Sequence, residues 1–399
     1  MKQAIQIKEN MYWVGVHDFN CRQFHGELFP ISEGTTYNAY LIVDEQITLI
    51  DTVEEEFMDI MMERIHSVIG ERAIDNVIVQ HAEPDHSSGF LKFMEAYPNA
   101  RAIASNAGAN AMLKQYFKEV AYEKVKTNDT LCTGKYTLTF IEMAMIHWPD
   151  NMLTYVKENG IIFSNDAFGQ HIVSYNIFDD GHSLETCIDR AKDYYANIVM
   201  PYGMQVANKL RQIAEMNLTF DMIAPSHGII WRTYIPQLLE SYEAFATFKQ
   251  TNKAVIVYES VWKHTQMMAE ALAEGLGQGG IHVKVYKNSA TSSALIMKEI
   301  LDAKAILVGS GNYNNTIAPG IASFLEKLSS CKVKGKKSLA FGSYGWGNVV
   351  TKALKERLEK AGLPSFHEDI ISQCYTPTEE DLDALIQLGK DLAEEIKTM

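Results

Sequence analysis

The chain has 399 residues, of which 47% are apolar and 22% charged, which is typical of a globular protein large enough for two domains. The net charge of −14 argues against nucleic-acid binding, and no run of about 18 apolar residues predicts a membrane span. Five scattered cysteines and an N-terminus without signal-peptide features predict a cytoplasmic protein that lacks a disulfide framework and a cysteine-ligated iron module.

The charge is distributed unevenly along the chain. Residues 251–399 contain 17 basic and 17 acidic side chains, so the whole net charge falls on residues 1–250. The pattern of predicted elements changes at the same place, near 248–253. We therefore predict two domains, residues 1–250 and residues 251–399.

The first part of the chain has a mixed pattern of strands and helices. Its first strands are separated by short turns, which favours antiparallel pairing, and later strands lie between helices. This order predicts an α/β layered sandwich. The predicted strands are residues 11–16, 36–43, 47–52, 76–80, 100–105, 136–142, 151–157, 161–164 and 221–226, and the predicted helices are residues 54–69 and 183–199.

The second part alternates strands with helices. Such alternation predicts a doubly wound parallel sheet with helices on both faces, as in flavodoxin-like domains. The predicted strands are residues 253–260, 282–287, 305–310, 338–343 and 366–371, and the predicted helices are residues 265–276, 294–302, 317–328, 349–361 and 379–397.

A dense group of potential metal ligands follows the predicted strand 76–80. The run is His81-Ala82-Glu83-Pro84-Asp85-His86. An extended start would place alternate side chains on one side, while Asp85 and His86, adjacent in a turn, could reach a second point. This arrangement suits two metals better than one. The alternative is a polar loop that caps a following helix.

Three further candidates each follow a β-run, where sites of α/β folds tend to collect. They are His147 in IHWPD, Asp166 in FSNDAFGQH and His227 in APSHG. A single histidine after a strand is usually structural, but four such strand ends together favour a metal site. His171 ends the third motif, and we interpret it as a supporting or structural residue.

The motifs HAEPDH, IHWPD, FSNDAFGQH and APSHG resemble those of the flavodiiron protein family, which has a metallo-β-lactamase fold. Zinc hydrolases of that fold carry His-x-His-x-Asp-His, whereas this sequence has Glu83 at the second histidine position. A carboxylate favours iron over zinc. The resemblance implies one iron held by His81, Glu83 and His147, a second held by Asp85, His86 and His227, and Asp166 as the bridge between them.

The resemblance also suggests residues near the substrate. His25 and Tyr195 would lie beside the irons and donate hydrogen bonds to bound substrate. The alternative for each is a role in core packing.

Three turns after successive strands of the second part predict a flavin site. The phosphate turn has no G-x-G-x-x-G motif, so FMN is favoured over a dinucleotide. His264, Gly311 and Asn312 depart from the pattern usual in the family. The predicted contacts are Ser260, Val261, Trp262, Lys263, His264 and Thr265 in the first turn, Ser310, Gly311, Asn312, Tyr313, Asn314 and Asn315 in the second, and Ser343, Tyr344, Gly345, Trp346 and Gly347 in the third.

The resemblance implies a complete function. An electron donor such as rubredoxin would reduce FMN, and two non-haem irons would reduce O2 to water or NO to N2O, in a head-to-tail homodimer. The alternatives are a dizinc hydrolase fused to a flavodoxin domain, and an electron-transfer protein with an inactive metal site. A basic cluster of Lys332, Lys334, Lys336 and Lys337 is either a solvated turn or a surface that steers the donor toward FMN.

Overall fold

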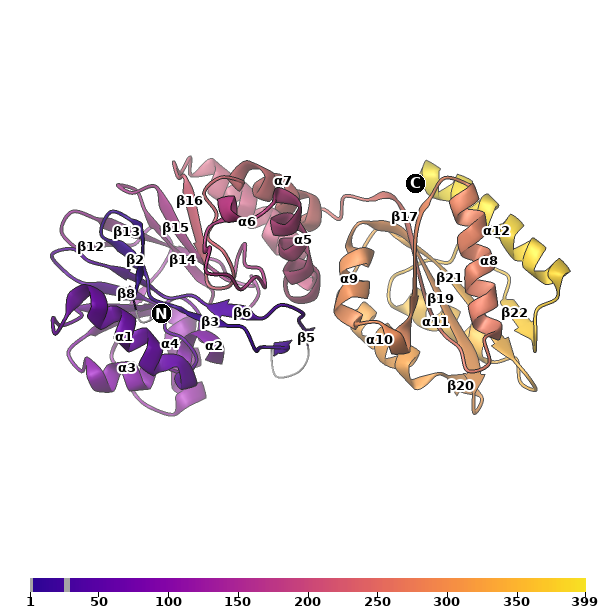
Figure 1. Cartoon of the computed structure of the whole chain (residues 1–399), viewed down its shortest axis with the longest axis horizontal. Helices are drawn as coiled ribbons and strands as arrows, with labels where there is room; N and C mark the ends of the chain where they lie inside the picture. Colours follow the sequence, from indigo (N-terminus) through magenta and orange to yellow (C-terminus); the bar gives the residue numbers. More distant parts are fainter. Residues whose placement is uncertain (1–2, 25–28) are drawn as a thin grey trace. The chain divides into compact units, whose positions relative to one another are not determined.

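The computed structural model describes residues 3–24 and 29–399 (Figure 1). Contacts between Cα atoms divide the chain into two units. Met1–Tyr194 with Met204–Glu243 form the first unit, and Tyr195–Gly203 with Ala244–Met399 form the second. The sequence pattern did not indicate that Tyr195–Gly203 belongs with the second unit, and the boundary at 250/251 stays a prediction.

The first unit contains two main sheets. The strand order in the larger sheet is β1-β2-β7-β8-β9-β10-β11, and in the smaller sheet it is β12-β13-β14-β15-β16. The strands of the larger sheet are β1 (Ile5–Lys8), β2 (Met11–Trp13), β7 (Tyr40–Ile42), β8 (Thr48–Ile50), β9 (Asn76–Val79), β10 (Arg101–Ser105) and β11 (Tyr122–Val125). Those of the smaller sheet are β12 (Thr130–Cys132), β13 (Thr137–Glu142), β14 (Met152–Val156), β15 (Ile161–Asn165) and β16 (Met222–Pro225).

Two short hairpins and a set of helices complete this unit. The hairpins pair β3 (Val16–Asp18) with β6 (Thr35–Tyr37) and β4 (Gln23–Phe24) with β5 (Phe29–Pro30). The helices are α1 (Met58–Ile69), α2 (Pro84–Ser87), α3 (Phe90–Ala96), α4 (Asn106–Tyr116), α5 (Leu184–Tyr194), α6 (Gly203–Glu215) and α7 (Ile235–Ala246). The π-helical turn that continues α5, Tyr195–Val199, belongs to the second unit.

The hydrophobic core of the first unit lies between its two sheets. Ile50, Ile78 and Ile103 from the larger sheet pack with Phe140 and Phe163 from the smaller one, and all five are almost completely buried. Full burial of each such side chain contributes about 1.5–3 kcal/mol to stability. The helices lie outside the sheets (Figure 1), which gives the metallo-β-lactamase-like αββα sandwich that the sequence predicts.

The second unit is built on one sheet with the order β18-β17-β19-β21-β22, and β20 pairs with β19. The pairs β17–β18, β17–β19, β19–β21 and β21–β22 are all parallel. This is the doubly wound flavodoxin-like order. The strands are β17 (Thr251–Glu259), β18 (His282–Lys287), β19 (Ala303–Tyr313), β20 (Thr316–Ile317), β21 (Lys337–Tyr344) and β22 (Ile371–Cys374).

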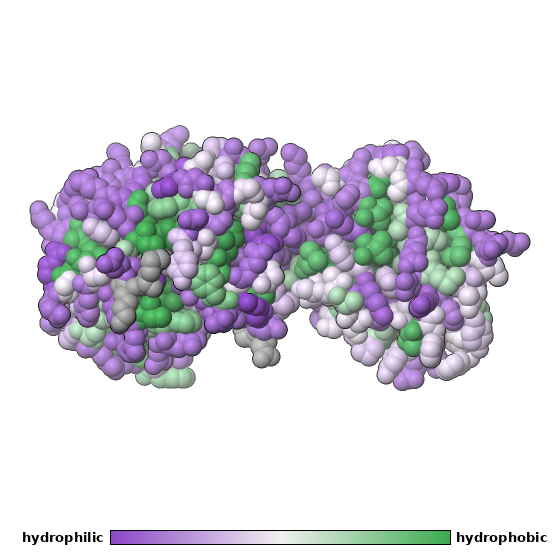
Figure 2. All heavy atoms as spheres, viewed as in Figure 1, coloured by the Kyte–Doolittle hydropathy of each residue, from purple (hydrophilic) through white to green (hydrophobic). Residues whose placement is uncertain are grey.

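Helices cover both faces of this sheet (Figure 1). Alternate strand residues, among them Ile256, Leu307 and Phe341, pack against Leu272 of one helix and Leu392 of another. The helices are α8 (His264–Gln278), α9 (Ser293–Leu301), α10 (Pro319–Ser330), α11 (Val350–Lys360) and α12 (Glu379–Thr398). Hydrophilic side chains dominate the visible face of each unit (Figure 2), as expected when apolar side chains gather between layers.

Two predictions about the second unit need correction. The strand predicted at 366–371 lies further along the chain, as β22, because pairing of Ile371–Cys374 with β21 fixes its register. The turn predicted at 310–315 is instead a β-hairpin between β19 and β20, with Asn314 and Asn315 at φ 49° and 58° in its two-residue loop. Positive φ at both positions is typical of a type I′ turn, which asparagine tolerates.

Among the described residues, no helix is long and apolar enough to cross a membrane.

Candidate diiron and flavin sites

Seven buried histidine and acidic side chains come together at the ends of four strands of the first unit. They follow β9, β13, β15 and β16, so both sheets contribute. The side chains form two groups, and within each group one potential ligand atom per residue lies within 4.8 Å of the others. The groups are His81, Glu83, His147 and Asp166, and Asp85, His86 and His227.

Asp166 faces both groups. Its Oδ2 lies 3.5 Å from His81 Nε2 and 3.3 Å from His147 Nε2. Its Oδ1 lies 3.0 Å from His86 Nε2 and 3.6 Å from His227 Nε2. One carboxylate therefore directs one oxygen at each group, which is the arrangement expected of a bridge between two metal ions.

The local backbone explains why one short run supplies both groups. After β9 the chain stays extended through Glu83, whose ψ is 142°. Pro84 then starts the short helix α2, where its fixed φ and missing N–H are tolerated. His81 and Glu83 thus project from an extended segment, while Asp85 and His86 project from a helical turn toward the second group.

Polar groups behind the cluster hold two of the imidazoles. His81 Nδ1 lies 3.0 Å from Asp150 Oδ2, which also accepts a hydrogen bond of 2.7 Å from the amide of Ala82. His227 Nδ1 lies 2.7 Å from the carbonyl oxygen of Thr36. Such contacts orient a metal-binding ring and leave Nε2 for the metal. Sequence reasoning missed Asp150, although it lies three residues after His147 in the motif.

The unpaired polar atoms of the cluster fit metal ions. Both carboxylate oxygens of Asp85, Oδ2 of Asp166, and Nε2 of His86 and His227 are buried and make no hydrogen bond within the described residues. They nevertheless lie close together, for example 3.1 Å between Asp85 Oδ2 and His227 Nε2. Buried polar atoms without partners are rare and need an explanation. A mixed imidazole and carboxylate set without thiolate suits iron.

The three predicted flavin turns lie at the carboxyl ends of β17, β19 and β21 in the second unit. A contact of 2.7 Å between the hydroxyl oxygens of Thr265 and Ser343 joins the first and third turns. Asn312 Oδ1 is buried and accepts no hydrogen bond from the described part of the chain, so the second turn presents an unused acceptor. Trp262 and Trp346 are 79% and 85% exposed, and such aromatic surface suits a flavin ring.

Comparisons with known proteins agree with this architecture. Residues 35–228 match the model of the ODP family beta lactamase, and residues 256–387 match the flavodoxin model. A nitric oxide reductase of Moorella thermoacetica is 41% identical over 397 residues, which cover 99% of this chain and 100% of that protein. This chain belongs to the flavodiiron protein family.

Two solved structures extend the likeness to three dimensions. The rubredoxin oxygen:oxidoreductase of Desulfovibrio gigas is 36% identical, with a TM-score of 0.95 and coverage of 99% of both chains. The flavodiiron protein of Giardia intestinalis is 28% identical, with a TM-score of 0.95, 99% of this chain and 97% of that chain covered. The cofactors of the present flavodiiron protein are accordingly FMN and a pair of non-haem irons, as the sequence predicts.

Two imidazoles of the flavodiiron cluster, His86 and His147, have raised pKa values when no metal is bound. Burial by itself lowers the pKa of His86, but Asp85 and Asp166 raise it to about 9. Burial also lowers the pKa of His147, and Asp166 and Glu83 raise it to about 9. Both imidazoles are therefore protonated at neutral pH in the metal-free protein, and metal binding must displace their protons.

We expect the melting temperature of the iron-free protein to fall as the pH rises from about 6.5 to about 9. The pKa of each imidazole rises from about 6.5 in the unfolded chain to about 9 in the folded one. The folded state then binds more protons across this window, so its stability is lost as they dissociate. The iron-loaded protein, whose imidazoles are neutral at all these pH values, is the control. Calorimetry that shows a rising melting temperature for the iron-free protein would contradict the assignment.

Two residues predicted beside the irons were His25 and Tyr195. His25 lies outside the described residues. Tyr195 is buried and its ring packs against Phe245, with ring centres 5.4 Å apart. The preceding residue, Tyr194, instead approaches the cluster, because its ring centre lies 6.1 Å from that of His227.

His171 belongs to neither ligand group, but its ring centre lies 6.1 Å from that of the ligand-group residue His227. Its Nδ1 lies 3.0 Å from the hydroxyl oxygen of Thr35, and its ring centre lies 5.1 Å from that of Tyr194. This placement agrees with our interpretation of His171 as a supporting residue.

The structure contradicts the role predicted for the basic cluster. Lys336 is buried, and its amine donates hydrogen bonds to the carbonyl oxygens of Leu301 and Ala303. The cluster ends at Lys337, the first residue of β21, whereas the third flavin turn follows the strand. A strand of 8 residues spans roughly 23 Å. The lysines therefore lie at the end of the strand remote from the flavin turns.

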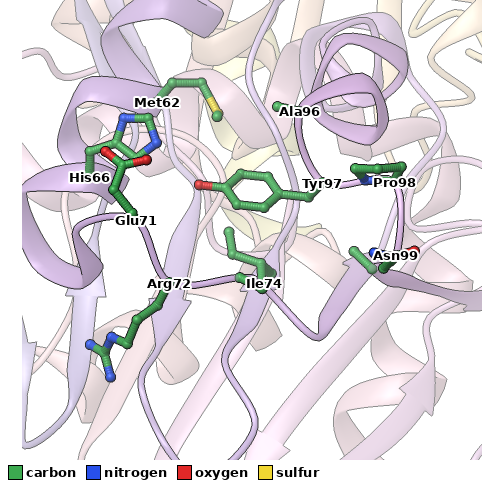
Figure 3. A pocket seen from close by; sticks show the side chains of 11 residues that line it. Met62, His66, Glu71, Arg72, Ile74, Ala96, Tyr97, Pro98 and Asn99 are labelled. Carbon is green, nitrogen blue, oxygen red and sulfur yellow. The ribbon is translucent and has the colours of Figure 1, made fainter.

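A surface pocket of about 320 Å³ lies elsewhere on the first unit and is lined by His66, Glu71 and Tyr97, among others (Figure 3). Its walls include Ile74, two residues before the start of β9, and Ala100, directly before the parallel strand β10. The pocket is thus at the amino ends of these strands. The metal ligands follow the carboxyl end of β9, so this pocket is not part of the diiron site.

Proposed function

We propose that this flavodiiron protein takes electrons from a donor protein and uses them to reduce NO to N2O or O2 to water. The observation that carries the proposal is Asp166, whose two oxygens face two separate ligand groups in a chain that also has a flavodoxin unit. Bound FMN would supply stepwise electron transfer, and the iron pair would bind and reduce a diatomic molecule. A hydrolase function is disfavoured for two reasons. Glu83 stands where zinc hydrolases of this fold have a histidine, and hydrolysis does not require FMN.

The protein supplies placement, water exclusion and proton donors. The ligand side chains are held by buried contacts such as that between His81 and Asp150. The chemistry consumes protons: two NO with two electrons and two protons give N2O and water, and O2 with four electrons and four protons gives two waters. A proton donor close to the irons is therefore required.

Tyr194 is the best candidate for a hydrogen-bond donor to the bound substrate. Its hydroxyl is buried and makes no hydrogen bond within the described residues. A Cβ placed on Gly169 would lie 3.2 Å from Cζ of Tyr194, so the phenol packs over the loop that begins with Asp166. Burial, followed by the charges of Asp166 and Asp85, raises the pKa of Tyr194 well above its usual value. The hydroxyl therefore keeps its proton at neutral pH.

The Tyr194→Phe variant is expected to lower turnover with NO or O2 about tenfold, the effect of one hydrogen bond of about 1.4 kcal/mol in the transition state. Iron content should be unchanged, because the hydroxyl is not a ligand. Tyr195→Phe is the matched control, since it makes the same change one residue along. Steady-state rates measured alongside iron content check both variants, and equal rates for the two would exclude Tyr194 as the donor.

The proposed activity is tested directly by anaerobic stopped-flow mixing of the reduced, iron-loaded protein with NO or with O2. We expect reoxidation of the flavin by at least one gas, and N2O detectable by gas chromatography when NO is used. Protein that holds iron and FMN but is reoxidised by neither gas would overturn the proposal. Two zincs in place of iron, in protein produced with iron available, would restore the hydrolase alternative.

We further propose rubredoxin or a similar protein as the donor, and a head-to-tail homodimer as the assembly. The first is supported by the name of the Desulfovibrio gigas relative. The second is implied by the family. Reduction of the FMN by added rubredoxin and sedimentation at twice the chain mass of 44.9 kDa are the respective tests. A cytoplasmic location stays a prediction.

A further inference from the structure

A fourth turn lies beside the three flavin turns at the carboxyl edge of the second unit's sheet. It follows β22 and consists of Tyr375 and Thr376; we call it the 375–376 turn. The sequence pattern did not indicate it, because it has no glycine-rich segment. The strand register places it next to the third flavin turn, since Cys374 pairs with Tyr344.

Tyr375 contacts the third flavin turn. Its amide donates a hydrogen bond of 2.8 Å to the carbonyl oxygen of Tyr344. A Cβ placed on Gly345 would lie 3.2–3.5 Å from the edge of the Tyr375 ring, so the ring lies against that glycine. Tyr375 has a φ of 56° and is 57% exposed. The backbone therefore holds an aromatic ring at the surface, where the third turn borders the flavin.

Thr376 contacts the phosphate turn. Its hydroxyl oxygen lies 3.0 Å from Nε2 of His264. His264 is the first residue of α8, where backbone amides without intrahelical partners form a natural anion site. Where the threonine hydroxyl donates to Nε2, the ring proton resides on Nδ1, the nitrogen nearer to the backbone of that helical turn. In that tautomer the contact would leave Nδ1–H as a donor in the turn that is predicted to bind the phosphate.

Neighbouring contacts fix the 375–376 turn on both sides. On one side, Asn348 Nδ2 donates a hydrogen bond of 3.0 Å to the hydroxyl of Ser372 in β22. On the other side, Thr378 and Asp381 form a capping box at the start of α12. A turn anchored at both ends can position a neighbouring side chain with little further loss of conformational entropy.

We propose that the 375–376 turn is a fourth component of the FMN site. Thr376 positions the His264 imidazole as a donor to the FMN phosphate, and Tyr375 borders the isoalloxazine ring. His264 occupies a position where the family usually has a hydroxyl residue, and the threonine contact explains how an imidazole serves there. The inference rests on the FMN assignment, but it does not depend on which gas is reduced.

The test measures dissociation constants of FMN and riboflavin from the flavin-free, full-length protein by quenching of flavin fluorescence. Riboflavin lacks the phosphate, so it isolates contacts to the ring. Thr376→Val is expected to weaken FMN binding about 3- to 10-fold, the effect of one hydrogen bond, and to leave riboflavin binding unchanged. Thr376→Ser, which keeps the hydroxyl, should bind FMN like the natural protein.

Two further variants separate the two roles. His264→Ala should weaken FMN binding, and adding Thr376→Val to it should have no further effect, because Thr376 acts through His264. Tyr375→Ala should weaken FMN and riboflavin binding by equal factors. Circular dichroism confirms that each variant is folded.

The outcomes distinguish this inference from the proposed function. Unchanged FMN affinity in Thr376→Val, or an equal loss of riboflavin affinity, would overturn the role of Thr376. Unchanged affinity for both flavins in Tyr375→Ala would overturn the role of Tyr375. A natural protein that binds no FMN at all would instead refute the proposed electron-transfer function.

Discussion

Replacement of Asp166 by alanine is expected to abolish iron binding by both ligand groups and to lower reductase activity by more than about 100-fold. Removal of a residue that only orients a metal ligand already lowers metal affinity or activity about 10- to 100-fold. Asp166 directs Oδ2 toward His147, at 3.3 Å, and Oδ1 toward His86, at 3.0 Å. Its loss would therefore remove one ligand from each iron. It would also remove the negative charge that lies between the two ligand groups.

His86→Ala is the comparison variant, because this imidazole serves only the second group and water can take its place. We expect a smaller loss of activity and the retention of more iron. Asp166→Asn serves as a second variant, since it keeps the volume and the acceptor for the 2.7 Å hydrogen bond from Ser226. Iron per chain, turnover and melting temperature are measured in parallel. Equal losses of iron and activity in Asp166→Ala and His86→Ala would contradict the bridging role.

The second large effect is expected for Asp150→Asn, which should lower iron affinity about 10- to 100-fold. The carboxylate accepts hydrogen bonds from both His81 Nδ1 and the amide of Ala82. An asparagine oxygen at the position of Oδ2 could still accept both bonds, but it carries no negative charge, and hydrogen bonds to a charged acceptor are roughly twice as strong as neutral ones. The His81 ring is then held less firmly and is less basic, so Nε2 binds the metal more weakly.

Asp44→Asn is a matched control for this prediction. Asp44 also accepts one backbone and one side-chain hydrogen bond, from the amide of Tyr136 and the hydroxyl of Thr133, but it touches no ligand residue. Both variants are titrated with iron against a competing chelator. The Asp44 variant should keep the natural affinity, and an Asp150 variant that does the same would remove this residue from the support of the site.

The sequence was sufficient to predict which side chains form the candidate metal cluster because they are local in origin. The run from His81 to His86 places four potential ligands in six residues, and its proline already marks where the helix α2 begins. Motifs at strand ends also carry His147, Asp166 and His227. Alternating strands and helices likewise predict the flavodoxin-like unit, since a buried parallel sheet requires apolar strands and covering helices.

The residues that sequence reasoning misplaced depend on contacts between distant segments. Tyr194 and Tyr195 are adjacent, and only the path of α5 into its π-helical turn decides which ring faces the cluster and which faces Phe245. The lysines near β21 were predicted to form one surface. Lys336, however, is buried and donates hydrogen bonds to the carbonyl oxygens of Leu301 and Ala303. A linear pattern gives the direction of neither side chain.

The sequence by itself thus determined the family, the two kinds of unit and the ligand types, because each is encoded in short motifs and in hydrophobic periodicity. Only the tertiary structure decided that Tyr194 rather than Tyr195 approaches the cluster, that Asp150 holds His81, and that the 375–376 turn meets His264. The physical reason is that these contacts join segments far apart in the chain, for example 69 residues apart for His81 and Asp150 and 112 apart for His264 and Thr376. Strand register and helix packing bring such segments together, and no local pattern specifies them.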